Sequence, residues 1–537
     1  MSLLDINDLN VSIGQTPILN SISMHMKSGE ILGLAGESGS GKTMTALAVA
    51  GLLPVRAEMS GQVVLDGVHL SDTDESEFCK IRGRDIGIVF QEPMTALNPV
   101  MTIGDQVAET VRLHRNVSRR DARLLARETL DKVGLGSSRF PMGRYPHDLS
   151  GGQRQRVAIA IAIALKPKLL IADEPTTALD VTTQAEILAL FRKLVRDDGV
   201  GLILVTHDLA VVAETADRVA VMQAGGIVDQ GSVANVFRSS ESPYVRKLLE
   251  NAVHVPVRTS KEIGVTPVLE TRNLVREYPG PRKLFGTGKP LRAVDDVSLQ
   301  IFSNENVGLV GESGCGKSTL LRAILGLDAA QAGEVRVFGQ RFPPDRNKEM
   351  RQLRQRIQVV FQDPFGTFDP RWRVEQLIAE NFHLFDSPPT GKDARKRVDG
   401  ILERVGMNSS DARRYPHEFS GGQRQRIAIA RALITEPSII ALDEAVSALD
   451  VSIRAQILDL LAELSDRLGV SYLFVTHDLS VARSITDRVL VMKDGRIVEQ
   501  GRTADVFDHP AHPYTVELLS AVPDIDRALS GKPVGST

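Results

Sequence analysis

The chain has 537 residues, of which 42% are apolar and 24% charged, and its formal net charge is −3. This composition is typical of globular domains, and the length allows about three to four average domains or fewer, larger ones. A chain so close to neutrality has no overall basic surface, which excludes nucleic-acid binding by net charge alone. The two cysteines, Cys79 and Cys315, form no CxxC pair. Their spacing argues against cysteine-ligated zinc or iron–sulfur sites and favours a reducing compartment.

The sequence predicts neither a secretory signal nor a membrane span. The N-terminal residues MSLLDINDLN lack a basic start followed by a long apolar run. The longest apolar runs, such as residues 157–165, are far shorter than the roughly 20 residues that a spanning helix needs. We therefore expect that any attachment to a membrane is made through another protein.

The first chemically informative element is a glycine-rich loop between a strand and a helix. Residues 30–36 (EILGLAG) predict a strand, and a helix is expected to begin near residue 42. The loop GESGSGKT at 36–43 fits the P-loop pattern, although one isolated match could be an ordinary glycine turn. In a P-loop, Lys42 would reach the β- and γ-phosphates and Thr43 would ligate Mg²⁺. The predicted nucleotide-binding residues are Gly36, Glu37, Ser38, Gly39, Ser40, Gly41, Lys42 and Thr43.

Further elements follow in the first half of the chain. Residues 61–67 (GQVVLDG) predict an antiparallel edge strand between glycine turns. Gln91 follows a phenylalanine and could be a plain strand end, and residues 103–135 predict a mainly helical insert. The loop HDLSGGQRQR at 147–156 is rich in glycine but has no phosphate-binding lysine. Taken alone, it would be a flexible loop with solvated arginines.

Two carboxylates and a histidine follow buried strands. Asp173 and Glu174 end the apolar run LLIADE, at the sheet edge where ligands bind in parallel α/β sheets. The aspartate can hold Mg²⁺ through water, and the glutamate can act as a general base. The alternative is a helix-capping pair on the surface. His207 follows the apolar run LILVT, where a single histidine is more often structural than catalytic.

The same series of motifs occurs a second time, in the same order. GESGCGKS at 311–318, FQDP at 361–364, HEFSGGQRQR at 417–426 and VTHDL at 475–479 repeat blocks of the first half. Because chance does not keep several blocks in register, the chain is a duplication. The counterparts in the second half are Gly311, Glu312, Ser313, Gly314, Cys315, Gly316, Lys317, Ser318, Gln362, Asp443, Glu444 and His477.

The predicted fold class is α/β, with two homologous P-loop NTPase domains. Each has a nucleotide-binding sheet, an antiparallel β part and a helical part. We expect the first domain at 1–252, a linker at 253–266 and the second domain at 267–537, because residues 251–267 have prolines and no helical period. A linker this short predicts that the two domains pack closely.

The ordered set of P-loop, glutamine, LSGGQ, acidic strand end, ALD and histidine resembles the ATP-binding domain of ABC proteins, twice over almost the entire chain. The resemblance implies a RecA-like sheet core in each half and ATP hydrolysis with Mg²⁺. It also implies that the halves pair head to tail, so that each ATP lies between one P-loop and the opposite Ser-Gly-Gly loop. The loop would thus lie far from its own P-loop because it serves the other half's nucleotide.

The resemblance assigns roles residue by residue. Gln91, Glu174 and His207 would be catalytic in the first half, and Gln362, Glu444 and His477 in the second. The Mg²⁺ ligands would be Thr43, Gln91, Asp173, Ser318, Gln362 and Asp443. The opposite half would contribute nucleotide contacts from Ser150, Gly151, Gly152, Gln153, Ser420, Gly421, Gly422 and Gln423. Asp180 and Asp450 match the loop that communicates across the dimer. Tyr278 fits the adenine-stacking aromatic, where the first half has Ile13.

The two tails resemble those of one importer group. Residues 236–250 and 506–523, the latter with HPAHPY, look like the C-terminal extension of peptide/nickel importer ATPases. The resemblance implies two integral-membrane permease subunits and an extracytoplasmic solute-binding protein as partners, without nucleic acid. The chain would then lie peripherally at the cytoplasmic face of the inner membrane, attached only through the permeases. Because the tail has no cysteine, no iron–sulfur cluster is expected.

Other interpretations stay open. A tandem ABC ATPase that acts on ribosomes would usually have a long charged connector and a basic tail. A DNA-repair ABC ATPase would need zinc cysteines or a coiled-coil insertion, and a non-enzymatic scaffold would tolerate loss of Glu174 or Glu444. Among importer substrates, peptides lead, and nickel chelates, glutathione, opines and sugars remain alternatives.

Overall fold

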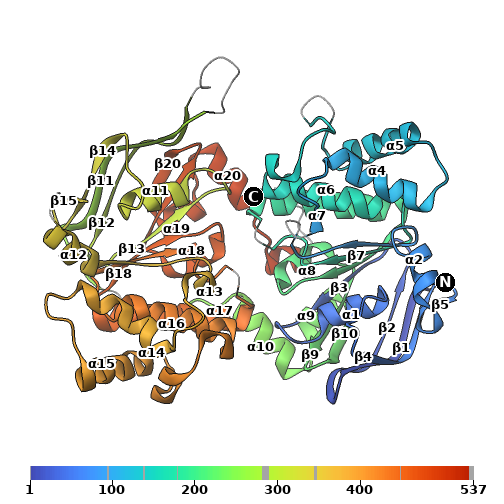
Figure 1. Ribbon diagram of the computed structural model, residues 1–537, viewed down its shortest axis with the longest axis horizontal. Coiled ribbons are helices and arrows are strands. Elements are labelled where there is room, and N and C mark those ends of the chain that lie inside the picture. The colour runs from blue at the N-terminus through green and yellow to red at the C-terminus, as the bar shows by residue number, and fades with distance from the viewer. Residues whose placement is uncertain are drawn as a thin grey trace.

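The structure is a computed structural model that describes residues 2–92, 96–136, 140–177, 179–259, 261–280, 290–343, 347–447 and 449–530. Figure 1 shows two similar halves side by side, with the N-terminus at the outer edge of the first half and the end of the described chain between the halves. Among the described helices, none is long and apolar enough to cross a membrane.

The first half contains a six-stranded and a four-stranded sheet in its described residues. Its strands are β1 (Ser2–Ile13), β2 (Thr16–Lys27), β3 (Ile31–Ala35), β4 (Ala57–Leu65), β5 (Val68–His69), β6 (Ile86–Val89), β7 (Leu169–Asp173), β8 (Gly201–Val205), β9 (Arg218–Gln223) and β10 (Gly226–Ser232). Its helices are α1 (Lys42–Val49), η1 (Leu70–Asp72), α2 (Glu75–Ile81), α4 (Ile103–His114), α5 (Arg119–Lys132), η2 (Pro146–Asp148), α6 (Gly151–Ile163), α7 (Val181–Asp198), α8 (Leu209–Thr215), α9 (Val233–Ser239) and α10 (Pro243–Ala252).

The six-stranded sheet has the order β10-β9-β3-β8-β7-β6, in which only the β9–β10 pair is antiparallel. Every residue of β3, β7 and β8 is buried, because helices or the second sheet cover both faces. Along β7, Leu170 and Ala172 pack among the helices of the insert, whereas Leu169 and Ile171 pack toward α1 and the antiparallel sheet. The period of two residues therefore divides one strand between two cores.

The antiparallel sheet corrects one prediction. Its order is β2-β1-β4-β5, so the strand predicted at 61–67 is an inner strand, paired with β1 on one side and with the two-residue β5 on the other. In the second half, likewise, β14 (Ala332–Val337) lies between β11 (Pro267–Tyr278) and β15 (Gln340–Phe342). Glycine turns marked the strand, but the short partner beyond each turn could not be recognised from its few residues.

The second half repeats this plan. Its strands are β11 (Pro267–Tyr278), β12 (Leu291–Phe302), β13 (Asn306–Val310), β14 (Ala332–Val337), β15 (Gln340–Phe342), β16 (Ile357–Val360), β17 (Ile439–Asp443), β18 (Ser471–Val475), β19 (Arg488–Lys493) and β20 (Arg496–Arg502). Its helices are α11 (Lys317–Ile324), α12 (Asn347–Arg356), α13 (Pro364–Thr367), α14 (Val374–Ala379), η3 (Glu380–Leu384), α15 (Gly391–Arg404), η4 (Ser409–Arg413), η5 (Pro416–Glu418), α16 (Gly421–Leu433), α17 (Val451–Leu468), α18 (Leu479–Ile485), α19 (Thr503–Asp508), α20 (Pro513–Ser520) and α21 (Ile525–Ser530). The sheet order β16-β17-β18-β13-β19-β20 mirrors that of the first half.

The halves face each other in opposite senses. In Figure 1 the helical parts, α4–α6 of the first half and α14–α16 of the second, lie at diagonally opposite corners, and so do the two antiparallel sheets. Helix α10 of the first half packs on α17 of the second, and α20 of the second approaches α7 of the first. The expectation of close packing between the halves is thereby met.

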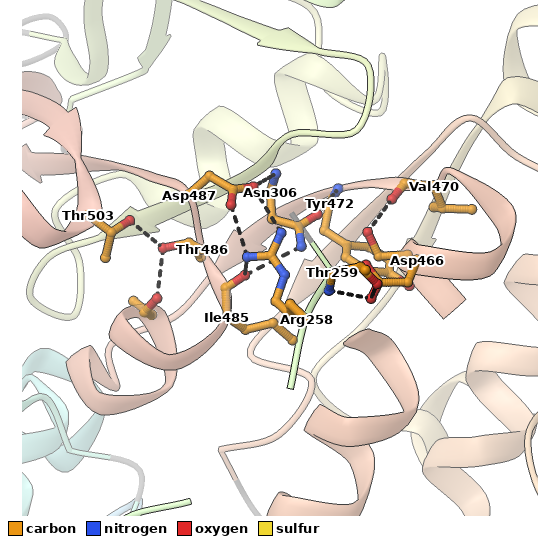
Figure 2. A network of polar contacts seen from close by, with 12 residues as sticks. Arg258, Thr259, Asn306, Asp466, Val470, Tyr472, Ile485, Thr486, Asp487 and Thr503 are labelled. Carbon is orange, nitrogen blue, oxygen red and sulfur yellow. Dashed lines mark hydrogen bonds and ion pairs between the residues drawn. The ribbon is translucent and has the colours of Figure 1, made fainter. Parts of the chain in front are cut away.

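The connection between the halves is fastened to the second half. Helix α10 ends at Ala252 and β11 begins at Pro267. Arg258 donates to the Ile485 carbonyl at 2.8 Å and pairs with Asp487 at 3.0 Å, and Thr259 bonds Asp466 (Figure 2). Asp487 also accepts from the backbone N–H of Asn306 at the start of β13. The connection thus lies against the amino-terminal ends of β13 and β19 in the second sheet.

The C-terminal helix α21 crosses back to the first half. Ile525 and Leu529 pack against the apolar cluster formed by α8, α9 and α10. Arg527 pairs with Glu214 at 2.5 Å, and Glu214 also accepts from the backbone N–H of Asp524 at 3.1 Å. Arg238 donates to the Leu529 carbonyl. The connection after α10 of the first half is therefore bound by the second half, and α21 of the second half is bound by the first.

Candidate active site

Each P-loop lies between the first strand of the parallel sheet and the helix that follows it. Gly36 and Gly311 have φ values of 146° and 150°, and a Cβ there would lie 2.3 Å and 2.2 Å from the carbonyl oxygens of Met222 and Met492. Only glycine fits both the backbone angle and this close approach. Glycine at this position therefore lets each loop pass close to the backbone of β9 or β19 before the helix begins.

The P-loop lysines are buried and fold back on their own loops. Lys42 Nζ donates to the carbonyl oxygens of Gly36 and Glu37, each at 2.8 Å. Lys317 Nζ does the same with Gly311 at 2.7 Å and Glu312 at 2.8 Å. Each ammonium is thereby held at the centre of a loop whose shape suits a polyphosphate.

Charges from both halves act on the first lysine. Burial lowers the pKa of Lys42, while the negative charges of Glu174, Asp173 and Asp450 oppose that change. Asp450 belongs to the second half and stands at the N-terminus of α17. The electrostatic environment of the first P-loop therefore includes the opposite half.

The acidic pair stands at the carboxyl end of β7 and its repeat at the end of β17, as the sequence predicts. Thr43 Oγ1 donates to Asp173 Oδ1 at 3.2 Å, which joins the P-loop to the acidic strand. Burial raises the pKa of Asp173 to about 6, partly offset by this hydrogen bond. Burial likewise raises the pKa of Asp443 to about 6. In the second half, Asp443 Oδ1 is buried without a hydrogen-bond partner among the described residues.

The glutamate of each pair is gripped by the predicted glutamine and histidine. Glu174 accepts from Gln91 Nε2 at 2.9 Å, and its other oxygen lies 3.0 Å from His207 Nδ1. Glu444 contacts Gln362 Nε2 at 2.8 Å and His477 Nδ1 at 3.1 Å. Three segments that are far apart in the sequence thus meet at one carboxylate in each half.

The glutamates are held ionised and in an uncommon backbone conformation. Burial pushes the pKa of Glu174 upward, but the hydrogen bond and charge of His207, the Thr177 hydroxyl and the charge of Lys42 together hold that pKa below its usual range. The pKa of Glu444 is lowered in the same way by His477. Their φ values, 45° and 48°, fall in the left-handed region that residues with a Cβ rarely adopt. Such strain is typical of functional positions.

The two sites differ at a hydroxyl that no sequence motif marks, Thr177 in the first half and Ser447 in the second. Thr177 Oγ1 donates to Glu174 Oε2 at 3.0 Å. At the matching position, Ser447 donates instead to the backbone carbonyl of Glu444, at 2.9 Å. The first carboxylate therefore has one more hydrogen bond than the second among the described contacts. A hydroxyl three residues after the glutamate was the only available signal.

The seam between the halves is closed at one P-loop and open at the other. Thr182 Oγ1 of the first half donates to Glu312 Oε1 at 2.8 Å, and the Ser313 N–H donates to Asp180 Oδ2 at 3.4 Å. At the first P-loop, a cleft of about 540 Å³ separates Glu37 from Ser452 and Gln456 of the second half. The ALD loops thus reach the opposite half, but to different extents.

The Ser-Gly-Gly loops are helix N-termini. The Ser150 hydroxyl caps α6 by accepting from the Gln153 N–H at 3.3 Å. In return, the Gln153 side-chain oxygen accepts from the Ser150 N–H at 3.1 Å. Ser420 and Gln423 form the same box on α16. Within the described residues, no hydrogen bond joins either loop to the opposite P-loop, whereas Asp180 and Thr182 of the first half do bond the second P-loop.

A second cleft, of about 530 Å³, lies between the halves and is lined by both His207 and His477. Ile13 and Tyr278 end the equivalent strands β1 and β11. The Tyr278 ring is covered on one side by the Arg276 guanidinium at 4.5 Å, and its hydroxyl donates to Asp328 at 3.1 Å. Cys79 and Cys315 are both free thiols.

Comparison with known proteins identifies the family of the chain. The family model described as ABC transporter matches residues 19–177 and 294–447, and the model described as Oligopeptide/dipeptide transporter, C-terminal region, matches 498–535. The chain is 43% identical to the glutathione import ATP-binding protein GsiA of Escherichia coli K12, over 97% of this chain and 90% of that protein. It matches GsiA of Shigella flexneri to the same extent. A solved structure of cbiO1 from Clostridium perfringens is 30% identical over 45% of this chain and 92% of its own, with a TM-score of 0.40.

The two family matches cover both sets of nucleotide-site motifs and the C-terminal extension. Together with the near full-length relatives, they account for the duplication and for the tail. The chain therefore belongs to the ABC transporter family, as a tandem ATPase of the peptide-importer type.

Proposed function

We propose that the chain hydrolyses ATP at two composite sites on the seam between its halves, each built from one P-loop and the opposite Ser-Gly-Gly loop. The main support is the pair of contacts that Asp180 and Thr182 make with Ser313 and Glu312. These contacts bring the start of α7 to the second P-loop. Since α6 packs on α7 through Gly152, closure of the seam would carry the loop at 150–153 toward the same phosphates.

The donor set suits Mg²⁺. Asp443 has a buried, unpaired carboxylate oxygen, and Thr43 with Asp173 provides a hydroxyl beside a carboxylate. Hard oxygen ligands of this kind, completed by phosphate oxygens, are what Mg²⁺ prefers. Thr43, Asp173 and Gln91 would hold it in the first half, and Ser318, Asp443 and Gln362 in the second. Once bound, Mg²⁺ would neutralise phosphate charge.

The protein groups divide the remaining work. Lys42 and Lys317 would exchange their loop carbonyls for phosphate oxygens. Glu174 and Glu444, already ionised, would accept the proton of the attacking water. His207 and His477 would hold those carboxylates in place and, with the opposite Ser-Gly-Gly loop, contact the γ-phosphate. Closure is favoured because ATP interacts with both halves only when they are closed.

The transported solute is proposed to be glutathione or a short peptide. Relatives at 43% identity are named as glutathione import proteins, and the tail matches an oligopeptide/dipeptide transporter region. The chain would work at the cytoplasmic face of the inner membrane, bound to two permease subunits that receive solute from an extracytoplasmic binding protein. In this arrangement the ATPase sets the direction of transport, and the solute specificity resides in the partners.

Uptake in membrane vesicles tests the solute. The chain would be co-expressed with the permease subunits it copurifies with, and vesicles would be loaded with ATP and given the binding protein. We expect labelled glutathione or a labelled dipeptide to accumulate with the wild-type chain and not with a Glu174→Gln, Glu444→Gln chain. Copurification with ribosomes in place of membrane proteins would contradict the importer assignment.

The crossed sites have their own test. Ser150→Arg should weaken nucleotide binding at the site of Lys317, whereas Ser420→Arg should weaken it at the site of Lys42. Photo-crosslinking of labelled ATP, followed by peptide mapping, reports occupancy of each P-loop separately. If each arginine affected the P-loop of its own half, the composite arrangement would be wrong.

A further inference from the structure

Each C-terminal extension places a tyrosine hydroxyl against the P-loop of its own half. Tyr244, on α10, accepts from the Glu37 backbone N–H at 3.2 Å. Tyr514, on α20, accepts from the Glu312 backbone N–H at 3.0 Å. The partners are 207 and 202 residues apart in the sequence, and the same contact occurs in both halves. This repetition sets it apart from an incidental surface contact.

The amide that meets the tyrosine belongs to the peptide group that holds the P-loop lysine. In the second half, the carbonyl of the Gly311–Glu312 peptide accepts from Lys317 Nζ at 2.7 Å, and the N–H of that peptide donates to Tyr514. In the first half, the Gly36 carbonyl accepts from Lys42 at 2.8 Å while the Glu37 N–H donates to Tyr244. Hydrogen bonds at the two ends of one amide polarise each other.

We propose that Tyr514 and Tyr244 are positioning residues, whose hydroxyls fix the peptide group that orients the P-loop lysine. This rests on the proposed nucleotide sites, because it takes Lys317 and Lys42 as the phosphate-binding groups. It gives the C-terminal extension a direct effect on nucleotide affinity. Neither tyrosine touches the nucleotide itself.

The surroundings leave the hydroxyl with this task. The Tyr514 ring is 3% exposed and lies in the apolar cluster that joins α18, α19 and α20 to Val181 of the first half. Lys493 Nζ lies 4.3 Å from the ring centroid. A phenylalanine would keep the ring packing but would leave the Glu312 N–H without its acceptor. The loss of a buried acceptor is more costly than the loss of an exposed one.

The same peptide is also linked to the other half. The carboxylate of Glu312 accepts from Thr182, so the second P-loop is held by its own extension at the backbone and by the first half at the side chain. At the first P-loop, Tyr244 and Glu37 line the cleft that faces Ser452. The tyrosine contact is therefore present whether or not the opposite half has closed on the loop.

Tyr514→Phe tests the proposal in a Lys42→Ala background, where only the second site binds. The probe is methylanthraniloyl-ATP with Mg²⁺, titrated by fluorescence, beside a thermal midpoint of the nucleotide-free protein. We expect Kd to rise roughly 3- to 10-fold, the range for one lost hydrogen bond, with a smaller fall in the midpoint than a truncation in the apolar cluster causes. Tyr244→Phe in a Lys317→Ala background should behave in the same way.

Leu518→Ala is the matched control, because it thins the same cluster without touching the hydroxyl. It should lower the thermal midpoint more than Tyr514→Phe does and leave Kd nearly unchanged. A Kd for Tyr514→Phe within twofold of its parent, or an equal rise in Leu518→Ala, would overturn the positioning role. Continued probe binding by the Lys42→Ala, Lys317→Ala chain would refute the nucleotide sites themselves, and the proposal with them.

Discussion

At the scale of single residues, each glutamate is prepared as a base before any nucleotide arrives. Glu174 has His207 on one oxygen and Gln91 and Thr177 on the other. Burial raises the pKa of Glu174, but His207, Thr177 and the charge of Lys42 together hold that pKa below its usual range, so the carboxylate is ionised at neutral pH. Oε2 accepts from two donors and Oε1 contacts one, so a water can bond Oε1 directly or replace a donor on Oε2. On Oε2, Gln91 is the exposed donor and the one best placed to move.

Replacing both glutamates with glutamine should therefore separate binding from hydrolysis. Glutamine keeps the size and can still bond the histidine, but it cannot take a proton. We expect turnover to fall by roughly 10²- to 10⁴-fold while ATP stays bound through rapid desalting. Phosphate release and retention of labelled ATP are the two measurements. Near-normal turnover in the double variant would refute the general-base role.

The buried Asp173 carboxyl predicts that the free energy of unfolding depends on pH, because its pKa is raised where that of Glu174 is lowered. Its pKa in the folded chain is about 6, above its ordinary value of 3.8, because of burial. Between these two values the folded state binds more protons than the unfolded state, so stability falls as the pH rises through this window. The full cost is present above pH 6.

Asp173→Asn should remove that cost. Without nucleotide or Mg²⁺, we expect the variant to be more stable than the wild type at pH 7.5 by about 1 to 3 kcal/mol, and nearly equal to it at pH 4. Denaturant titrations at the two pH values give the comparison. The same gain at both pH values would show that relief of strain, and not titration of the carboxyl, explains the result.

At the scale of elements, helix α6, which begins at the Ser-Gly-Gly loop, packs closely on α7 because Gly152 has no side chain. A Cβ on Gly152 would lie 2.3 Å from Thr183 Cγ2, whereas one on Gly151 would meet nothing nearer than Leu179 at 3.7 Å. Thr183 is β-branched and lies in the first turn of a helix, so it has little freedom to move aside. The second of the two glycines is therefore the one that sets the distance between the helices.

Gly152→Ala should destabilise the first half, and Gly151→Ala should not. We expect a cost of about 1 to 3 kcal/mol for the overpacked variant. Thermal unfolding of the nucleotide-free chain measures it, with Gly151→Ala as the matched control. Adding Thr183→Ala should restore most of the loss. If the two alanine variants melted alike, close packing of α6 on α7 would not explain the glycine.

The sequence alone was sufficient for the elements whose chemistry is local. The P-loops, the acidic strand ends and the inserts at 103–135 each have a short pattern, and β3, α1, β7, α4 and α5 follow it. The prediction that Gln91 and His207 converge with Glu174 came from family resemblance and is matched by the hydrogen bonds.

Contacts between distant backbone and side-chain groups could not be foreseen. The Glu37 N–H and the Tyr244 hydroxyl carry no shared pattern, since any residue has an N–H and the proline before the tyrosine reads only as a helix start. The inner position of β4 was missed because β5 has two residues. The difference between the two P-loops at the seam depends on how the halves dock, which no local segment determines.

At the scale of the whole molecule, the extensions cross. The end of α10 and the connection after it lie on the second half, with Asn251 against Ser452 at 2.9 Å and His254 against Asp459 at 2.7 Å. Helix α21 lies on the first half, with Arg527 against Glu214. The ion pairs of His254 and Arg527 involve no P-loop residue, so they can persist while the nucleotide sites open and close.

A chain cut between the halves should therefore stay together. A protease site inserted after Glu262 would leave residues 253–259 bound to the second half and α21 bound to the first. We expect the two fragments to co-elute on size exclusion at micromolar concentration, and to co-elute less completely once residues 523–537 are also removed. Complete separation of the cut, full-length tail form would contradict the tethering role of α21.

The tether also settles which halves can meet. Because each half is joined to its counterpart by the connection and by α21, pairing of two identical halves cannot compete with the intramolecular pair at ordinary dilution. A replacement in one half then affects a single, defined place in the assembly and is never doubled by symmetry. The two halves differ at equivalent positions, with Ile13 in place of Tyr278 and Thr177 in place of Ser447. A fused chain can accumulate such differences independently, so its two nucleotide sites can evolve apart.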